Sequence, residues 1–431
     1  MPRMSHGSEA ASAGDALFRV RGPRPDSLQT PAEALAIILD PVMRGELYPY
    51  LRRLQELAPR YRSDALHGRP AWLLTSHADA VTVLGNRALV SDARNAEIFN
   101  TGPTGRHFFE LIKRTLLYMD PAEHDRIRGM LARHFTPRAI SRYEPLMREV
   151  VEGLLDRAAE SKRFDLVKDL AYALPTAVIC KIMGVPGEDL TVFHGWLNDF
   201  ARRGDISGVT PEVEAAGEAA TLGFTRYFLD LIRERRRKPT NDLISLLIEC
   251  EDEQGRLTDD QLVCLCVLMI QAGHETTADM IGLAMLALIR NPDQLTLLRS
   301  EPQLLREAIE ELLRFDGSNQ LVQRVSNEDF WLGDTLVRAG EVCSIFTGAA
   351  ARDPARFDDP DRLDIRRPDV QHFAFGGGTH VCLGASLARS EIRIMLGGIL
   401  RRFPGLRIDG GPLEYRDSLV LRGLKSLPVS I

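Results

Sequence analysis

Cys382 lies in a stretch whose composition fits a reactive thiol, FAFGGGTHVCLGAS at 373–386. The glycines leave the backbone bare and the thiol approachable. A thiolate in such a turn at a helix start is well suited to binding one metal ion, because the helix N-terminus stabilises its charge. A nucleophilic Cys–His pair stays open, although His380 is very close in sequence for a base. A dinucleotide-binding loop is excluded, because the third glycine of GxGxxG would fall at Val381. A Walker loop is excluded, because the stretch contains no Gly-Lys.

A second set of polar residues interrupts a helix that should be buried. The pattern predicts a helix at 258–290 that begins with a capping box at Thr258, and its first half is almost entirely apolar. The stretch QAGHETTAD follows, with Gly273, Glu275 and Thr276. A mid-helix glycine costs about 1 kcal/mol relative to alanine, and a buried carboxylate needs partners. Such locally unfavourable residues are often functional, although this part of the helix could also reach the surface.

Two further stretches place ionic side chains at helical spacing. In MDPAEHDRIRG, Asp120 can begin a helix on which His124 and Arg128 share one face, as an anion clamp would require. In EAIEELLRF, Glu311 and Arg314 are three residues apart. Taken alone, both pairs are typical of a solvated helix surface, where an ion pair contributes only about 0.5 kcal/mol.

The composition limits what the chain can bind. It has 431 residues, of which 44% are hydrophobic and 26% charged, with a formal net charge of −6. This acidic balance argues against a general nucleic-acid or anionic-membrane binder. The six cysteines form no CxxC pair, which is typical of a reduced protein. The longest apolar run, 262–270, is too short to span a bilayer, and the N-terminus has no signal-peptide core. We expect a soluble, cytoplasmic protein.

The elements that must position these residues are mostly helical. Residues 1–30 are rich in Gly, Ser, Ala and Pro and are expected to form a flexible tail, so that residues 31–431 form a single domain. Helical periodicity covers roughly 139–160, 211–236, 258–290, 300–315 and 384–402. Strand-like segments lie at 71–76, 341–346 and 418–423. Residues 98–115 indicate either an ordinary surface loop or a lid with a short helix. The expected fold is mainly α with a minor β part.

The four chemical stretches, in this order, resemble those of the cytochromes P450, and specifically of the soluble bacterial type. FGGGTHVCLG fits the haem-ligand signature of that family at Phe375, Gly378, His380, Cys382 and Gly384. AGHETT is similar to the family's oxygen-activation motif, ELLR to its Glu-x-x-Arg, FDDPDRLD to its meander and DPAEHDRIR to the helix that grips the haem. The resemblance extends from about residue 40 to the end of the chain. It implies the P450 fold, with a long central helix over the haem.

The resemblance also implies haem b (iron protoporphyrin IX) as the cofactor, with the thiolate of Cys382 as the iron ligand. Four side chains would neutralise the two haem propionates: His124, Arg128, Arg324 and His380. Glu311 and Arg314 would then belong to a structural network that Arg362 completes, rather than to the surface.

On the distal side, the resemblance implies a kink at Ala272 and Gly273 that leaves a groove for dioxygen. Thr276 would hydrogen-bond the oxygen, and Glu275 would relay protons from solvent. This intact acid–alcohol pair favours a monooxygenase that uses O2. The alternatives are a P450-type oxidase or a peroxide-driven coupling or cyclising enzyme, and a non-catalytic module that recruits carrier proteins. A gas sensor is not favoured, because no output domain is attached.

The substrate side of the resemblance rests on two segments. Residues 316–320 replace the usual proline-containing turn, so Asn319 and Gln320 could hydrogen-bond a polar substrate group. Apolar residues occupy the lid and this turn: Phe99, Phe108, Phe109, Leu111, Leu321 and Val322. They indicate a sizeable, mostly apolar molecule, and the bacterial type often modifies natural products such as macrolides and other polyketides.

The resemblance implies separate electron donors, a ferredoxin and its NAD(P)H-dependent reductase. An acidic ferredoxin would dock on a basic face near Cys382, for which Arg126, Arg133 and Arg138 are candidates. We expect a monomer. Arg352, where asparagine is frequent in the family, has no interpretation from the sequence.

Overall fold

The structure is a computed structural model that describes residues 22–66, 68–100, 102–119, 121–205, 209–252 and 255–431. Most of the expected tail and the expected helix cap Asp120 lie outside the described residues. The last part of that tail is packed on the domain. Leu28 is buried and its carbonyl accepts a hydrogen bond from Arg53 (2.7 Å), while Thr30 caps the helix that follows. The anchored part of the chain therefore begins before residue 31.

Seventeen α-helices and twelve strands are described. The helices are α1 (Pro31–Leu39), α2 (Leu47–Leu57), α3 (His77–Gly85), α4 (Ala93–Ala96), α5 (Arg106–Ile112), α6 (Pro121–Ala132), α7 (Pro137–Ile140), α8 (Glu144–Ser161), α9 (Ala173–Met183), α10 (Leu190–Arg203), α11 (Pro211–Arg237), α12 (Leu243–Glu249), α13 (Asp259–Arg290), α14 (Pro292–Ser300), α15 (Leu305–Phe315), α16 (Thr347–Ala350) and α17 (Ala385–Arg402). The strands are β1 (Arg60–Ser63), β2 (Ala71–Leu74), β3 (Leu89–Val90), β4 (Arg163–Asp165), β5 (Glu251–Asp252), β6 (Gly255–Arg256), β7 (Leu321–Ser326), β8 (Phe330–Leu332), β9 (Thr335–Val337), β10 (Val342–Phe346), β11 (Arg407–Ile408) and β12 (Pro428–Ser430). No helix among the described residues is long and apolar enough to cross a membrane.

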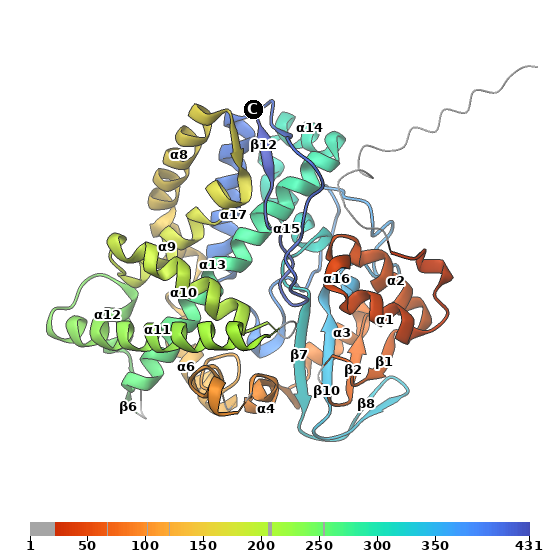
Figure 1. Cartoon of the computed structure of the whole chain (residues 1–431), viewed down its shortest axis with the longest axis horizontal. Helices are drawn as coiled ribbons and strands as arrows, with labels where there is room; N and C mark the ends of the chain where they lie inside the picture. The colour runs from red at the N-terminus through yellow and green to blue at the C-terminus, as the bar shows by residue number, and fades with distance from the viewer. Residues whose placement is uncertain (1–21, 67, 101, 120, 206–208, 253–254) are drawn as a thin grey trace, which may run out of the picture.

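Most of the helices form one side of the molecule, and the largest sheet lies on the other, with α1, α2, α3 and α16 around it (Figure 1). The sheet has the strand order β1-β2-β10-β7-β3. β10 runs parallel to β2 and antiparallel to β7, and all five of its residues are buried. Burial on both faces explains why its sequence, VCSIF, shows no alternation of polar and apolar residues. The strands predicted at 71–76 and 341–346 are confirmed as β2 and β10, so the mainly α fold has the expected minor β part.

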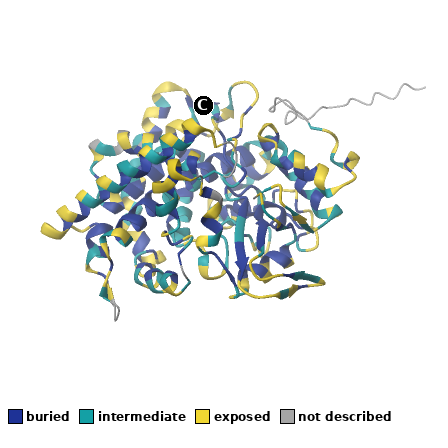
Figure 2. Ribbon diagram, turned by 60° about the horizontal axis from the view of Figure 1, so that its bottom comes forward, coloured by how far each residue is buried: buried dark blue, intermediate teal, exposed yellow. Residues whose placement is uncertain are grey.

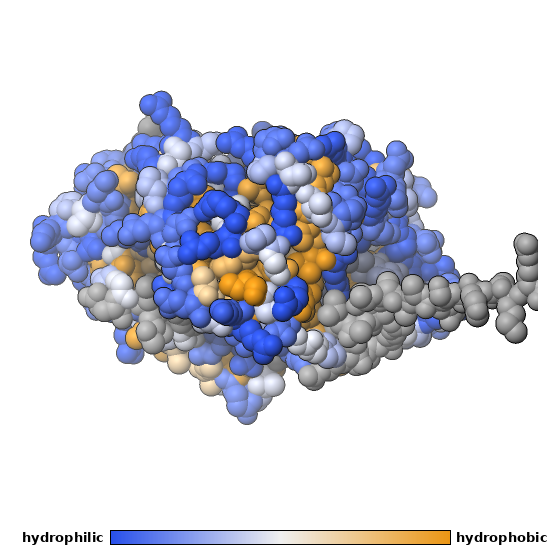
Figure 3. All heavy atoms as spheres, turned by 90° about the horizontal axis from the view of Figure 1, so that it is seen from above, coloured by the Kyte–Doolittle hydropathy of each residue, from blue (hydrophilic) through white to orange (hydrophobic). Residues whose placement is uncertain are grey.

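The long central helix is confirmed as α13. Its N-terminal capping box forms as predicted, because the Thr258 hydroxyl accepts from the N–H of Gln261 (3.2 Å) and the Gln261 side chain accepts from the N–H of Thr258 (2.9 Å). Its apolar first half is buried. Buried residues fill the centre of the molecule and exposed ones its rim (Figure 2). Seen from above, hydrophilic side chains cover most of the surface, and hydrophobic ones show in recesses between them (Figure 3).

The strand predicted at 418–423 is wrong. This segment forms a single bridge, between Leu421 and Asn319, flanked by two backbone hydrogen bonds that join Val420 to Gln320 (2.9 Å) and Arg422 to Ser318 (2.7 Å). The partner is a short turn rather than a strand, so the pairing cannot extend into a ladder. The other predicted helices are found with small shifts at their ends as α8, α11, α15 and α17, and the expected lid contains the short helix α5.

Candidate functional site

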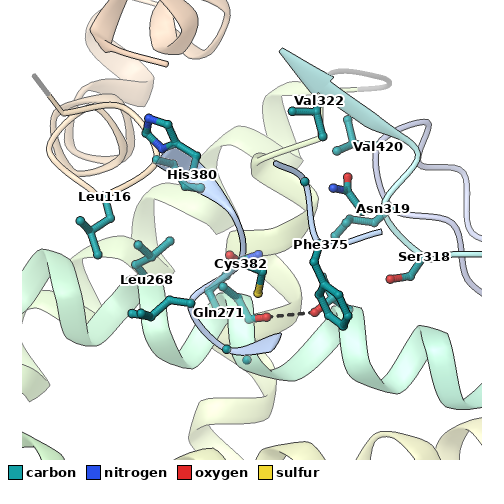
Figure 4. A pocket seen from close by; sticks show the side chains of 18 of the residues that line it. Leu116, Leu268, Gln271, Ser318, Asn319, Val322, Phe375, His380, Cys382 and Val420 are labelled. Carbon is teal, nitrogen blue, oxygen red and sulfur yellow. Dashed lines mark hydrogen bonds between the residues drawn. The ribbon is translucent and has the colours of Figure 1, made fainter. Parts of the chain in front are cut away.

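One cavity brings the predicted chemistry together. It has a volume of about 470 Å³ and lies between the cysteine loop, α13 and the segment that leads into β7. Figure 4 shows Cys382 and Phe375 on that loop, Leu268 and Gln271 on α13, and Asn319 before β7, all around the same space. Side chains from α5 and α10 complete the far wall.

The thiol of Cys382 faces this cavity just before α17 begins. The loop is closed by a hydrogen bond from the Cys382 N–H to the carbonyl of Phe375 (2.8 Å). Gly378 has a φ of +66°, and a Cβ there would lie 2.0 Å from the carbonyl oxygen of Leu84, so only glycine fits. Burial raises the pKa of the thiol, whereas a hydrogen bond from the N–H of Gly384 and two nearby guanidinium groups lower it. Burial is the larger effect and the pKa of the thiol is raised overall, while the N–H and the guanidinium groups act toward the thiolate that metal binding requires.

One end of the cavity is lined by His124, Arg128, Arg324 and His380. The two imidazole centroids are 4.0 Å apart, and the two guanidinium groups donate to backbone carbonyls of the cysteine loop (2.6 and 3.2 Å). Burial, together with the neighbouring positive charges, lowers the pKa of His380 to about 3, and burial lowers that of Arg324 to about 10. Among the described residues, Asp125 beside His124 (2.9 Å) is the one carboxylate in contact with this group. Two arginines therefore face one carboxylate, so among the described residues this end of the cavity, the cationic end, has an excess of positive charge.

The opposite wall comes from α13. Ala272, Gly273 and Thr276 line the cavity, and the Thr276 hydroxyl donates to the carbonyl of Ala272 (3.1 Å), a contact that often bends helices. Glu275 is not part of this wall. Its side chain is buried on another face of α13, where it pairs with Arg416. Burial raises the pKa of Glu275, and Arg416 acts against that shift. The acid and the alcohol, adjacent in sequence, thus face different surroundings.

The Glu-x-x-Arg pair is buried rather than on the surface. Glu311 and Arg314 are joined by two hydrogen bonds (2.7 and 2.8 Å), and neither side chain is exposed (0%). The expected third member, Arg362, is wrong. Arg367 occupies that place, with its Nε 3.2 Å from Glu311, whereas the Arg362 side chain is exposed and only its carbonyl faces the network. Both arginines lie in the same irregular loop, where no periodicity indicates which one points inward.

The expected substrate wall is found in part. Asn319 lines the cavity together with four of the six apolar residues named from the sequence: Phe99, Phe108, Leu321 and Val322. Phe109 and Leu111 do not line it. Gln320 as a substrate contact is wrong. It is buried on the other side of the chain, where its amide donates to the Tyr48 hydroxyl (3.0 Å) and the Gly317 carbonyl (2.6 Å).

A buried ionic cluster holds this wall in place, and the sequence did not reveal it. Asp316 accepts hydrogen bonds from Arg422 (2.7 Å) and from the Tyr48 hydroxyl (2.7 Å). Arg352 is explained by the same cluster. Its guanidinium stacks between the rings of Tyr48 (3.7 Å) and Phe315 (4.2 Å) and donates to the Phe315 carbonyl (2.8 Å). The cluster links the N-terminal helices to the two segments that form the cavity wall.

These surroundings fit haem b. A macrocycle with two carboxylates would supply the negative charge that the cationic end lacks, and its iron would take the thiolate that faces the cavity. The apolar part of the lining suits the macrocycle and an apolar substrate beside it. A dinucleotide or a nucleoside phosphate would not account for the cysteine, because neither offers a metal ion that a thiolate could bind.

Comparisons with known proteins agree with this fit. The sequence model of the family described as "Cytochrome P450" matches residues 223–421. The chain is 38% identical over 399 residues to nocardicin C N-oxygenase of Nocardia uniformis subsp. tsuyamanensis, covering 91% of this chain and 97% of that protein. It is 37% identical over 381 residues to mycinamicin IV hydroxylase/epoxidase of Micromonospora griseorubida, covering 87% and 93%.

Solved structures give the same answer. The structure of P450BioI in complex with acyl carrier protein ligated to hexadec-9Z-enoic acid superposes with a TM-score of 0.85 and 31% identity, over 90% of this chain and 99% of that one. A second structure, CalO2, has a TM-score of 0.83 and 33% identity, over 91% and 98%. The relatives of this chain include bacterial monooxygenases that act on natural products. With this identity along nearly its whole length, the chain belongs to the cytochrome P450 family, whose members bind haem b.

Proposed function

We propose that the protein, as a monomer, inserts one oxygen atom from O2 into a sizeable and mostly apolar natural product of the polyketide or macrolide type. The observation that carries this is the shared cavity, in which a thiol, a cationic end, Thr276 and a largely apolar wall face one space. Relatives named for acting on nocardicin C and mycinamicin IV support the substrate class.

Each part of the cavity has a role in this proposal. Haem b, when bound, supplies the activation of dioxygen with two electrons. The Cys382 thiolate would hold the iron, and the propionates would be held by Arg128 and Arg324 through charge and by His124 and His380 through hydrogen bonds. The hydroxyl of Thr276 would hold a proton at the cavity, and Glu275 would resupply it after turning away from Arg416. The apolar wall would keep water from the reacting carbon.

Asn319 is proposed to orient the substrate. Its side chain lines the cavity and makes no hydrogen bond with a described residue, so it is available to a ligand group. Asn319→Leu is expected to raise the dissociation constant of an oxygen-bearing substrate about tenfold, because one hydrogen bond is lost. The measurement is the substrate-induced shift of the haem absorbance. A hydrocarbon ligand of similar size should bind both proteins equally, and an equal loss for both ligands would place the effect in the packing of the wall instead.

A ferredoxin is proposed as the electron donor. Arg133 and Arg138 are exposed, and α7, which carries Arg138, packs on α17 directly after the cysteine loop. Arg138→Glu is expected to slow reduction by an acidic ferredoxin several-fold at low salt, with a smaller effect at high salt. Stopped-flow reduction measures this. Arg338→Glu, at an exposed arginine of the β8–β9 hairpin region, is the control and should reduce normally; equal slowing by both variants would remove the proposed face.

The carbon monoxide difference spectrum of the reduced protein tests the proposed function first. The long-wavelength band of the family requires haem bound through a thiolate. A compound library would then be screened by the spin-state shift, and hits incubated with ferredoxin, its reductase and NAD(P)H. Turnover with hydrogen peroxide alone, and none with ferredoxin, would favour the peroxide-driven alternative. A well-folded protein that retains no haem would favour the recruitment module.

A further inference from the structure

Two buried carboxyl groups share a single arginine behind the oxygen-activation wall. Glu275 and Asp279 lie one helical turn apart on α13 and are 3% and 1% exposed. Arg416 pairs with both, through Nη2 to Glu275 and through Nη1 to Asp279 (3.3 Å). The same Nη1 donates to the hydroxyl of Tyr172 (2.8 Å), which lies 3.4 Å from Asp279. Glu275 is the closer of the two acids to Arg416.

The charges of this group do not balance if both acids ionise. One guanidinium offsets one carboxylate, and a second buried anion would be left without compensation. Burial raises the pKa of Asp279 to about 8, with the charge of Glu275 adding to the shift and Arg416 opposing it. The other titratable groups around the pair are Tyr172, Asp205 and His274. At neutral pH Asp279 is therefore the protonated acid of the two, and Arg416 forms its ion pair with the ionised Glu275.

The packing around Arg416 keeps its guanidinium in the cluster, so that it can change its ion-pair partner but not leave both acids. Its backbone N–H donates to the carbonyl of Gly423 (2.8 Å), which fixes the strand-like segment that carries it. A Cβ at Gly423 would lie 2.0 Å from the Asp279 carboxylate, so the absence of a side chain there makes room for this acid. The guanidinium thus stays between two carboxyl groups that are both within its reach.

We propose that Asp279 is a positioning residue that releases Glu275 for proton delivery. The proton passes from the Asp279 carboxyl to the Glu275 carboxylate, and Arg416 moves its ion pair from Glu275 to Asp279. The O–H bond of Asp279 breaks and that of Glu275 forms, so the net charge of the buried group is unchanged. Glu275, now neutral and without an ion pair, can turn toward Thr276. This inference rests on the role proposed above for Glu275.

Infrared spectroscopy of the resting protein tests where the proton resides. At pH 7, a protonated-carboxyl band that shifts in ²H₂O and on ¹³C labelling of aspartate carboxyl groups is expected. It should vanish on titration with a midpoint near the pKa of Asp279, about 8. It should also vanish in Asp279→Asn, and in Glu275→Gln, where Arg416 is left to Asp279 alone and draws out its proton. The buried carboxyl of Glu391, whose pKa burial raises well above its usual value, gives a band that aspartate labelling leaves in place.

Turnover measures the consequence. Asp279→Asn cannot give up a proton or attract Arg416, so kcat should fall about tenfold, with KM nearly unchanged, a larger solvent isotope effect and more electrons lost to hydrogen peroxide. Asp242→Asn is the matched control, because it removes a buried Asp–Arg pair (2.5 Å to Arg235) elsewhere in the fold. It should reduce stability without changing the isotope effect.

The proposal is overturned if the aspartate-specific band is missing from the wild-type protein, or if it persists in Asp279→Asn. It is also overturned if Asp279→Asn couples electrons to product as well as the wild type. The infrared result needs no substrate and no electron donor, so it stands even if the proposed monooxygenase reaction fails. A wild-type protein that oxygenates substrate but lacks the band would refute the role of Asp279 alone.

Discussion

Cys382→Ala is expected to abolish the long-wavelength carbon monoxide band and to lower monooxygenase turnover by more than about 100-fold. Removing even a partner of a metal ligand typically costs 10–100-fold in affinity or activity, and here the ligand itself is lost. The thiol faces the cavity from the cysteine loop, and no other cysteine lines that cavity in the described part of the chain. The measurements are the reduced carbon monoxide spectrum and product formed per haem.

The control for this variant is Cys250→Ala. That cysteine is buried away from the cavity, where its sulfur accepts from Arg133 (3.2 Å). It should keep the spectrum of the wild type. The two arginines and two histidines at the cationic end are intact in Cys382→Ala, so the variant should still bind haem weakly, with the spectrum of a haem that has no thiolate ligand. A normal band in Cys382→Ala would mean that another thiol ligates the iron.

The parts of the site that local sequence determines could be predicted. The cysteine loop needs its glycine at 378 because the backbone there adopts a φ of +66° and a Cβ would lie 2.0 Å from the carbonyl oxygen of Leu84. The start of α13 needs only Thr258 and Gln261, three residues apart. The cationic end was accessible through the resemblance, because each of its four residues sits in a recognisable stretch. The capping contact lies within its own motif, whereas the cysteine loop is contacted by Leu84, Arg128 and Arg324 from distant parts of the chain. The two arginines could be predicted only because the resemblance supplies the motifs.

The side chains that the sequence could not place depend on distant partners. Gln320 turns away from the cavity toward Tyr48, 272 positions earlier in the chain. Glu275 faces Arg416, 141 positions later, in a segment with no motif of its own. Arg367 rather than Arg362 meets Glu311 because of how an irregular loop folds back over α15. Periodicity assigns a residue to a helix face but does not tell which other segment will cover that face.

The two ends of the cavity are held in place by different parts of the chain. Its cationic end uses backbone carbonyls of the cysteine loop to hold two arginines in place. Its substrate end is held by the Asp316–Arg422 pair, which ties the turn before β7 to the segment near residue 420. If Asn319 orients the substrate as proposed, this arrangement allows specificity to change there without disturbing the cationic end; two relatives of this chain are named for acting on different molecules.

Glu311→Gln is expected to lower the free energy of unfolding by about 3–5 kcal/mol, a large part of the stability of a typical protein. The Glu311 carboxylate is fully buried and accepts hydrogen bonds from Arg314 (2.7 and 2.8 Å), Arg367 (3.2 Å) and the N–H of Asp364 (3.1 Å). The neutral amide of glutamine leaves both guanidinium groups without a counter-charge. Its NH₂ group would also point at groups that are themselves hydrogen-bond donors. Denaturant unfolding, followed by the loss of haem absorbance, measures the change.

Glu310→Gln makes the same change one residue earlier, in a glutamate that also pairs with an arginine but is partly exposed. It therefore shows how much of the loss in Glu311→Gln comes from burial of the pair. Glu310 also pairs with an arginine, Arg389 (2.7 and 2.8 Å), but about a third of its side chain is exposed (32%), so the expected loss is below about 1 kcal/mol. Burial would raise the pKa of Glu310, but hydrogen bonds from Arg389 and His372 lower it to about 2. Its contribution is therefore present above the usual glutamate pKa and is lost as the pH falls from about 4 toward 2. The expected loss stays small because solvent screening at this partly exposed side chain weakens the pairing that the pKa shift reflects. Equal losses in the two variants at pH 7 would show that the buried network adds no more than a surface pair.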